Sequence, residues 1–156
     1  MGAEHNCYWL IDEEGMEMAL GGLNATLRDF AKVGRLFLNN GNWNGKQLVS
    51  ESWVKESQTM DAEHLLPSSE NSLHPGVGYG YQWWIPDGDE GELWARGVFN
   101  QYIYINPTTN TVIVKLSANQ KFYDYEHPVS DGAVNLELLR KVAHSFTPDP
   151  ELEATL

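Results

Sequence analysis

Two short motifs in this sequence carry side chains of the types that perform nucleophilic catalysis. Ser52 and Lys55 are separated by two residues in a segment predicted to be helical, so the lysine amine lies one turn from the serine hydroxyl and can act on it as a base. Tyr104 and Asn106 form a Tyr-x-Asn motif in a segment predicted to be a strand. Whether either pair does chemistry depends on the elements that carry it.

The other candidates for chemistry are the single cysteine and the five histidines. Cys7 lies two residues from His5, but catalytic Cys and His side chains pair in space and not by adjacency in sequence, so we interpret Cys7 as a buried structural thiol. His64 and His74 share a predicted loop with two glutamates, which we interpret as solvated. The histidines have no metal-site spacing, so we expect no metal and no cofactor. They are His5, His64, His74, His127 and His144.

The elements that position these residues follow from apolar periodicity and turn residues. Apolar residues from Leu27 to Phe37 recur with helical spacing, which predicts a helix that Asn24 or Thr26 caps and that residues 39–41 end. Short connections make the later strands antiparallel neighbours. The further predicted elements are a short helix at 51–58 capped by Ser50, strands at 79–85, 92–98, 101–105 and 111–117, and a final helix at 131–146.

This order of elements belongs to the α+β class. We predict an antiparallel sheet of about four strands, with helices before it and a C-terminal helix packed on it. Alternation in the last strand predicts that Val112 and Val114 face one side and Ile113 the other. The 156 residues fit one domain, which we place at 1–147, followed by an acidic tail at 148–156.

Composition excludes several classes of function. The formal net charge of −12 argues against binding the phosphate backbone of nucleic acid, which needs clustered Lys and Arg. No apolar run approaches the ~20 residues that span a bilayer, so we expect no membrane partner. A single cysteine cannot form an internal disulfide, and the N-terminus lacks the pattern of a signal peptide. We therefore expect a cytoplasmic protein by default.

Four separated segments resemble one known family. The Gly-Gly-Leu, Thr, Asp, Ala and Gly pattern at 21–34 is similar to that of the serine β-lactamase-like (penicillin-recognising) superfamily, and the segments at 41–50, 78–84 and 95–101 agree with it in the same order. The resemblance covers nearly the whole chain. It is closest to the branch that holds class C β-lactamases, esterases and 6-aminohexanoate-dimer hydrolases, and it implies a partial β-lactamase-like fold.

The resemblance implies serine chemistry, but only part of its machinery. In the family a Ser-x-x-Lys nucleophile and a Tyr-x-Asn element precede the helix that follows Gly-Gly-Leu, and here only about twenty residues precede that helix, so we expect both elements to be absent. The resemblance implies a peripheral helix at 51–58, anchored in the core by Trp53, and a central strand for Tyr104. We therefore interpret Ser52 to Lys55 and the Tyr104 motif as chance matches.

Only the family's third motif has a counterpart in this sequence. The segment from Ala95 through Arg96 to Gly97 occupies the Lys-Thr-Gly position, which implies that Gly97 permits close approach of the backbone and that the N–H of Val98 is an oxyanion donor. An alternative for Gly97 is a bulge or tight packing within a strand.

The third motif also departs from the family pattern. Ala95 removes the ammonium group that β-lactamases use near the substrate carboxylate, and Arg96 replaces a hydroxyl group. These departures favour an esterase or amidase over a β-lactamase. The resemblance further implies that Gln101 and Asn24 can reach the substrate pocket.

Three hypotheses for the function remain open. The chain is a C-terminal piece of a serine hydrolase that is inactive alone; or it is half of a split hydrolase completed by an N-terminal partner; or it is a non-catalytic binding or structural module that forms a homo-oligomer. Met1 falls within a stretch that relatives continue without interruption, which favours the first. In each case the missing half leaves a sheet edge and apolar surface uncovered, so we expect self-association or rearranged packing that hides them. The candidate partners are a second copy of this chain and an N-terminal partner chain.

Overall fold

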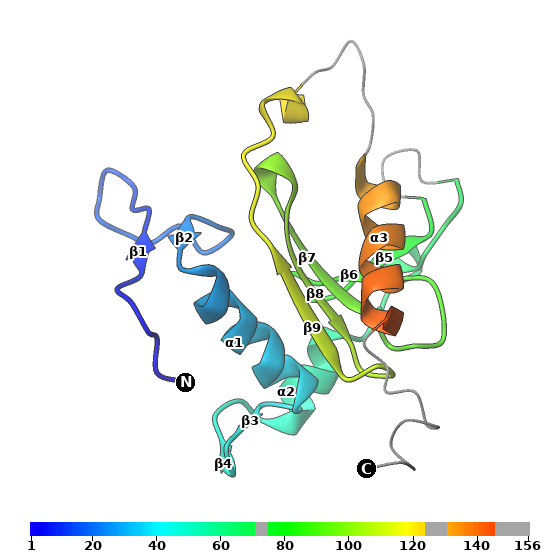
Figure 1. The fold of residues 1–156 in the computed structure, drawn as a ribbon, viewed down its shortest axis with the longest axis horizontal. Helices are drawn as coiled ribbons and strands as arrows, with labels where there is room; N and C mark the ends of the chain where they lie inside the picture. The colour runs from blue at the N-terminus through cyan, green and yellow to red at the C-terminus, as the bar shows by residue number, and fades with distance from the viewer. Residues whose placement is uncertain (71–74, 124–130, 146–156) are drawn as a thin grey trace.

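A computed structural model describes residues 1–70, 75–123 and 131–145 of the chain. Its centre is an antiparallel sheet of five strands that lie side by side in chain order. Helix α1 (Leu27–Leu38) lies on one face of this sheet and helix α3 (Asp131–Ser145) on the other (Figure 1). The predicted α+β class and the C-terminal helix packed on the sheet are confirmed. The five strands are β5 (Val77–Tyr79), β6 (Trp84–Pro86), β7 (Leu93–Gly97), β8 (Gln101–Asn106) and β9 (Thr111–Lys115).

The smaller elements lie before, between and after these strands. Two short antiparallel pairs flank α1, and a second helix leads toward the sheet. The pairs are β1 (Tyr8–Trp9) with β2 (Leu23–Asn24), and β3 (Asn42–Trp43) with β4 (Lys46–Gln47); the helix is α2 (Glu51–Ser57), and the short 3-10 turns are η1 (Glu63–Leu65), η2 (Val98–Asn100) and η3 (Gln120–Tyr123).

The sheet has one strand more than the sequence predicts. The predicted strand at 79–85 is two strands, because the chain reverses between β5 and β6. In this turn the N–H of Gly80 donates to the carbonyl of Trp83 at 2.9 Å, and Gln82 has a φ of 64°. A side chain on Gly80 would place its Cβ 2.2 Å from the carbonyl oxygen of Ser57, so only glycine fits where the turn crosses the end of α2.

Both faces of the sheet are apolar because a helix covers each of them. On one face, residues of β7 and β8 pack against residues of α3: Trp94, Tyr102, Tyr104, Leu136, Leu139 and Ala143. On the other face, Ile103 and Ile105 of β8 lie in the cluster that includes Phe37 and Leu38 of α1. Val112 belongs to the α1 side and Ile113 to the α3 side, which confirms the predicted alternation at these two positions of β9.

Both helix caps are residues that the sequence analysis proposed, but the predicted anchor of α2 is wrong. Thr26, rather than Asn24, caps α1, and Ser50 caps α2 as predicted. The anchor of α2 is Val54, which is fully buried, whereas Trp53 is half exposed and packs on the ring of an exposed tyrosine. Helical geometry turns neighbouring residues about 100° apart, so only one of the two can face the core.

The prediction that Cys7 is a buried thiol is also wrong, since Cys7 is exposed. It lies in the N-terminal segment before β1, which carries many exposed residues and does not enter either core cluster. His74, His127, Phe146 and the predicted tail at 148–156 lie outside the described residues. Within the described part, no helix is long and apolar enough to cross a membrane.

The N-terminal segment is attached to α1 through a buried carboxylate. Asp29 accepts hydrogen bonds from the N–H of Glu4 at 2.8 Å, from the hydroxyl of Thr26 at 2.8 Å and from the amine of Lys32 at 2.9 Å. The bond from Glu4, followed by those from Lys32 and Thr26, holds the pKa of Asp29 well below its ordinary value. The charged form of Asp29 therefore stabilises the folded state.

This cluster predicts how stability responds to acid. Because the folded-state pKa of Asp29 is lowered, its contribution is fully present above the unfolded pKa of about 3.9 and is lost as the pH falls through the folded value. We expect Asp29→Asn to lower the Tm at pH 7, and we expect the difference from wild type to shrink as the pH drops below about 4. Thermal unfolding followed by circular dichroism between pH 7 and pH 2 measures this. A difference that stays constant with pH would contradict it.

Candidate functional site

The segment that matches the family's third motif forms the hairpin between β7 and β8. Gly97 pairs with Gln101 across the two strands, and the three residues between them, Val98 to Asn100, make the turn. Val98 is 48% exposed and Gly97 is also exposed, so the backbone at Gly97, which has no side chain to cover it, is accessible from outside the chain. The side-chain amide of Gln101 donates to the carbonyl of Val98 at 3.3 Å, which fixes one end of the turn.

The packing of this chain does not require a glycine at position 97. Gly97 has a φ of −104°, which any residue adopts. A Cβ at Gly97 would lie 3.4 Å from the Cβ of Gln101 and 3.5 Å from its carbonyl oxygen, which is ordinary van der Waals contact. The alternative of tight packing within the strand therefore finds no support in these distances.

The two residues before Gly97 lie on opposite faces of the sheet. Ala95 packs against the cluster on the α1 side. Arg96 points to the α3 side, where its guanidinium lies 5.2 Å from the ring centre of Trp84 and 4.7 Å from that of Trp94. Burial against these rings lowers the pKa of Arg96. Arg96 thus stacks between two tryptophans, and its predicted role in substrate binding stays a prediction.

Asn24 is not joined to the hairpin by any interaction among the described residues. It is an exposed residue of β2, and its side-chain amide donates to the carbonyl of Gly22 at 2.9 Å. The structure therefore brings together Gly97, Val98 and Gln101 of the predicted site residues. The predicted contribution of Asn24 to a pocket remains a prediction.

The Tyr104 motif is part of the core between β8 and α3. Tyr104 is fully buried, and its hydroxyl donates to the carboxylate of Glu92. Burial, with this bond as the second cause, raises the pKa of Tyr104 above its ordinary value. The amide of Asn106 donates to the Tyr104 hydroxyl at 3.2 Å. A buried tyrosine whose hydroxyl is hydrogen-bonded to a buried carboxylate stabilises the core and is not accessible to transfer a proton to a substrate.

The Ser52 motif lies on the exposed side of α2. The Ser52 hydroxyl donates to the hydroxyl of Ser50 at 3.2 Å, and none of the hydrogen bonds of the described residues joins Ser52 to Lys55. We expect a fluorophosphonate to leave Ser52 unlabelled, because among the described residues its hydroxyl is hydrogen-bonded only to Ser50 and to no base. Labelling of the wild-type chain and of Ser52→Ala tests this, and a label that is lost in Ser52→Ala would make Ser52 a nucleophile.

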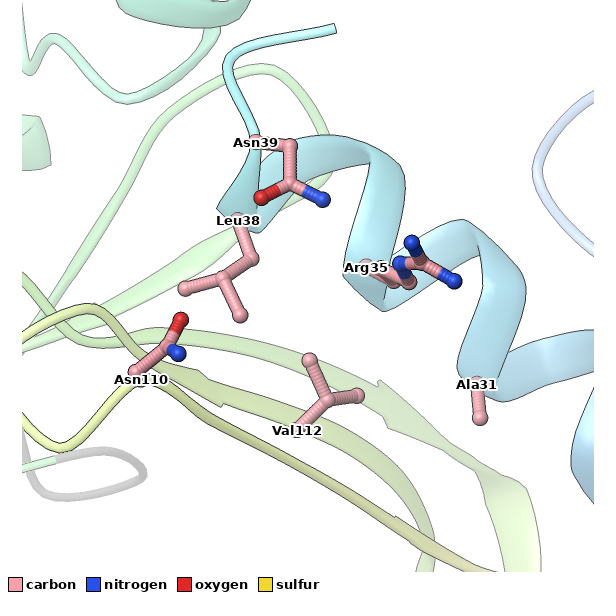
Figure 2. Close-up of a pocket in the computed structure, with 6 residues that line it drawn as sticks. All are labelled: Ala31, Arg35, Leu38, Asn39, Asn110 and Val112. Carbon is pink, nitrogen blue, oxygen red and sulfur yellow. The ribbon is translucent and has the colours of Figure 1, made fainter. Parts of the chain in front are cut away.

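The hollow between α1 and β9 lies away from the hairpin. It has a volume of about 470 Å³ and contains no carboxylate, hydroxyl or imidazole among its lining residues. Figure 2 shows the side chains of Arg35, Leu38 and Val112 around it. Arg35 stacks on the ring of Trp43 at 4.8 Å. Within the part of the chain that the structure describes, no group of three or more His, Cys, Asp or Glu residues is placed to hold a metal ion.

Comparison with known proteins identifies the family. The family model described as Beta-lactamase matches residues 2–134. This chain belongs to the β-lactamase family. The 6-aminohexanoate-dimer hydrolase of Paenarthrobacter ureafaciens is 32% identical over 119 residues, which is 76% of this chain and 30% of that protein.

A solved structure supports the same assignment. A candidate 6-aminohexanoate-dimer hydrolase from Bacillus anthracis has a TM-score of 0.76 and 33% identity, and the match covers 96% of this chain and 36% of that one. This β-lactamase-family chain therefore spans about a third of the length of the relatives it matches.

The conformation of the hairpin turn is the feature that sequence reasoning missed. Phe99 and Asn100 have φ values of 62° and 64°, and Asn100 is nearly buried. A usable signal existed, because three residues between paired strands with Asn at the last position are typical of a hairpin loop with a left-handed residue. No comparable signal exists for Phe99, since a bulky residue rarely adopts this conformation.

Proposed function

We propose that this β-lactamase-family chain forms the oxyanion-binding side of a serine hydrolase pocket and is inactive alone. The backbone N–H of Val98 is one oxyanion donor. The Ser-x-x-Lys nucleophile and the Tyr-x-Asn element belong to the part of such a hydrolase that this chain does not cover, whether that part lies in the same longer protein or in a partner chain.

The observation that carries this proposal is that position 97 is exposed and that the packing of the fold does not require a glycine there. Among the described residues, a Cβ at this position would meet only Gln101, at 3.4 Å. Glycine at such a position leaves room for another group to approach the backbone. A carbonyl oxygen of a substrate, lying against the Val98 N–H, needs that room.

We propose an ester or an amide as the substrate. Ala95 supplies no ammonium group for a β-lactam carboxylate, and it is packed into the core on the α1 side. The relative from Paenarthrobacter ureafaciens is named for hydrolysing the dimer of 6-aminohexanoate. These two facts favour an esterase or amidase over a β-lactamase.

We also propose that a further polypeptide part covers apolar surface left open here. Large apolar side chains of the hairpin that contains β1 are more than 40% exposed, as are two residues on the outer face of α3. Exposed apolar patches of this kind mark interaction surfaces. These residues are Tyr8, Trp9, Leu10, Ile11, Met16, Met18, Leu20, Val134 and Leu138.

Reconstitution tests the proposal. We define the completed hydrolase as this chain co-expressed with the part of the Bacillus anthracis relative that it does not cover. We expect no turnover of a p-nitrophenyl ester by the chain alone and measurable turnover by the completed hydrolase. Labelling by a fluorophosphonate should mark the added part only. Covalent labelling of this chain would overturn the proposal, because it would reveal a nucleophile here.

A second candidate is a non-catalytic module that forms a homo-oligomer, and the exposed apolar hairpin favours it. In that case light scattering of the chain alone should show a mass that rises with concentration to a defined oligomer. The completed hydrolase would then show no turnover. A monomer at all concentrations would contradict this second candidate.

A further inference from the structure

The turn between β7 and β8 is held in a conformation that its residues do not favour. Phe99 and Asn100 are consecutive residues with φ values of 62° and 64°. Non-glycine residues rarely adopt this left-handed conformation, and Asn tolerates it better than Phe. Such backbone persists only where surrounding contacts enforce it, and it occurs often at functional sites. The contacts that hold Phe99 and Asn100 therefore hold two of the three residues of the turn that begins at Val98.

Asn100 is held by two side chains from the sheet. Its carbonyl oxygen accepts a hydrogen bond from the amine of Lys115 at 3.0 Å. Its side-chain oxygen accepts a bond from the hydroxyl of Tyr102 at 3.0 Å. Lys115 belongs to β9, which does not flank the turn, so its bond ties the turn to a third strand.

Phe99 is held from the other side of the turn. Its carbonyl oxygen accepts a bond from the N–H of Asn119 at 3.4 Å. Its ring packs edge-on against the ring of Phe122 in η3, with 5.9 Å between the ring centres. These contacts come from the segment that directly follows β9, so β9 and its extension hold both unusual residues.

Lys115 is itself fixed by a row of side chains that crosses the sheet. Its amine lies 5.1 Å from the ring centre of Tyr102, and the Tyr102 ring lies 5.1 Å from that of Trp94. Arg96 continues the row between Trp94 and Trp84. Tyr102 and Trp94 are buried, so the amine has a rigid base from which to reach Asn100.

We propose that Lys115 is a positioning residue: its bond to the Asn100 carbonyl holds the left-handed turn and thereby aims the Val98 N–H. The oxyanion duty of Val98 rests on the proposed function, whereas the control of the turn by Lys115 does not. Lys115 touches no reacting atom in this scheme. It acts through Asn100, and Tyr102 supports it by fixing both the amine and the Asn100 side chain.

The conformational part is tested on the chain as it stands. Lys115→Met removes the amine and keeps an unbranched apolar stem, and Lys46→Met is the matched control in the exposed β4. We expect Lys115→Met to shift the backbone amide NMR resonances of Val98, Phe99 and Asn100 and to speed their hydrogen exchange at least about tenfold, with Lys46→Met leaving both unchanged. Unchanged turn resonances in Lys115→Met would overturn the proposal.

The catalytic consequence is tested in the completed hydrolase. We expect Lys115→Met to lower kcat for a p-nitrophenyl ester at least about tenfold with KM within about twofold, because a misdirected oxyanion donor weakens only the transition state. Lys115→Arg should restore part of the loss. A lower Tm with unchanged kcat would make Lys115 merely structural and overturn the proposal. If the completed hydrolase is inactive with Lys115 present, the proposed function fails, and the amide resonances still decide the role of Lys115 in the turn.

Discussion

Replacing Gly97 with alanine should abolish most of the activity of the completed hydrolase while leaving the fold intact. We expect kcat to fall roughly 100- to 1,000-fold, which is the effect of losing one oxyanion donor. The reason is that a methyl group beside the Val98 N–H occupies the space that the substrate carbonyl needs. The chain itself accepts the methyl group, because its nearest contact would be the Cβ of Gln101 at 3.4 Å, so the Tm should stay within about 2 °C of wild type.

Gly80→Ala is the control for this experiment. Its Cβ would lie 2.2 Å from the backbone oxygen of Ser57, which cannot be relieved by rotating a side chain. We therefore expect Gly80→Ala to lower the Tm and to lose activity by unfolding. Steady-state kinetics and thermal unfolding of both variants separate the two causes. If Gly97→Ala lost activity only in proportion to a lowered Tm, its role would be in packing and not in oxyanion binding.

The largest effect on stability should come from Arg140. This residue of α3 donates from Nε to both carboxylate oxygens of Glu92, at 2.9 Å each, and also donates to the carbonyl of Asp87. Glu92 is only 3% exposed. Removing the partner of a buried charge costs about 3–5 kcal/mol. Because Arg140 is itself partly exposed, we expect Arg140→Met to lower the free energy of unfolding by about 3 kcal/mol, the lower end of this range.

The neighbouring residue supplies the control. Lys141 forms an ion pair with Glu137 at 2.7 Å, but these side chains are 73% and 68% exposed, so Lys141→Met should cost about 0.5 kcal/mol or less. Urea unfolding of both variants measures the difference. The double variant Arg140→Met with Glu92→Gln should recover part of the loss, because it removes the unpaired charge. Equal effects of the two single variants would contradict the importance of the buried pair.

Local patterns in the sequence predicted most of the fold. The helical spacing from Leu27 and the capping side chain of Ser50 were sufficient, because caps and amphipathic faces depend on residues a few positions apart. The split of one predicted strand at Gly80 was not predictable, since it depends on the close approach of Ser57 from another element. The exchange of Trp53 for Val54 as the anchor of α2 depends on the direction in which that short helix meets the sheet.

The candidate site was likewise predictable only in part. The resemblance located Gly97, Val98 and Gln101 in sequence, and the hairpin between β7 and β8 places them together. The left-handed conformation of Phe99 could not be predicted, because the contacts around it come from Asn119 and Phe122, about 20 residues away in sequence. Contacts over such distances leave no periodic signal. The stacking of Arg96 between Trp84 and Trp94 likewise depends on strand register, which the sequence does not specify.

The order of the strands has a consequence for how this region folds. Each strand from β5 to β9 pairs with the next one along the chain, so the sheet closes only short loops as it grows. Folding rates rise as contacts become more local in sequence. The meander can therefore form during synthesis as each strand emerges from the ribosome, and its assembly does not have to wait for a distant segment of polypeptide.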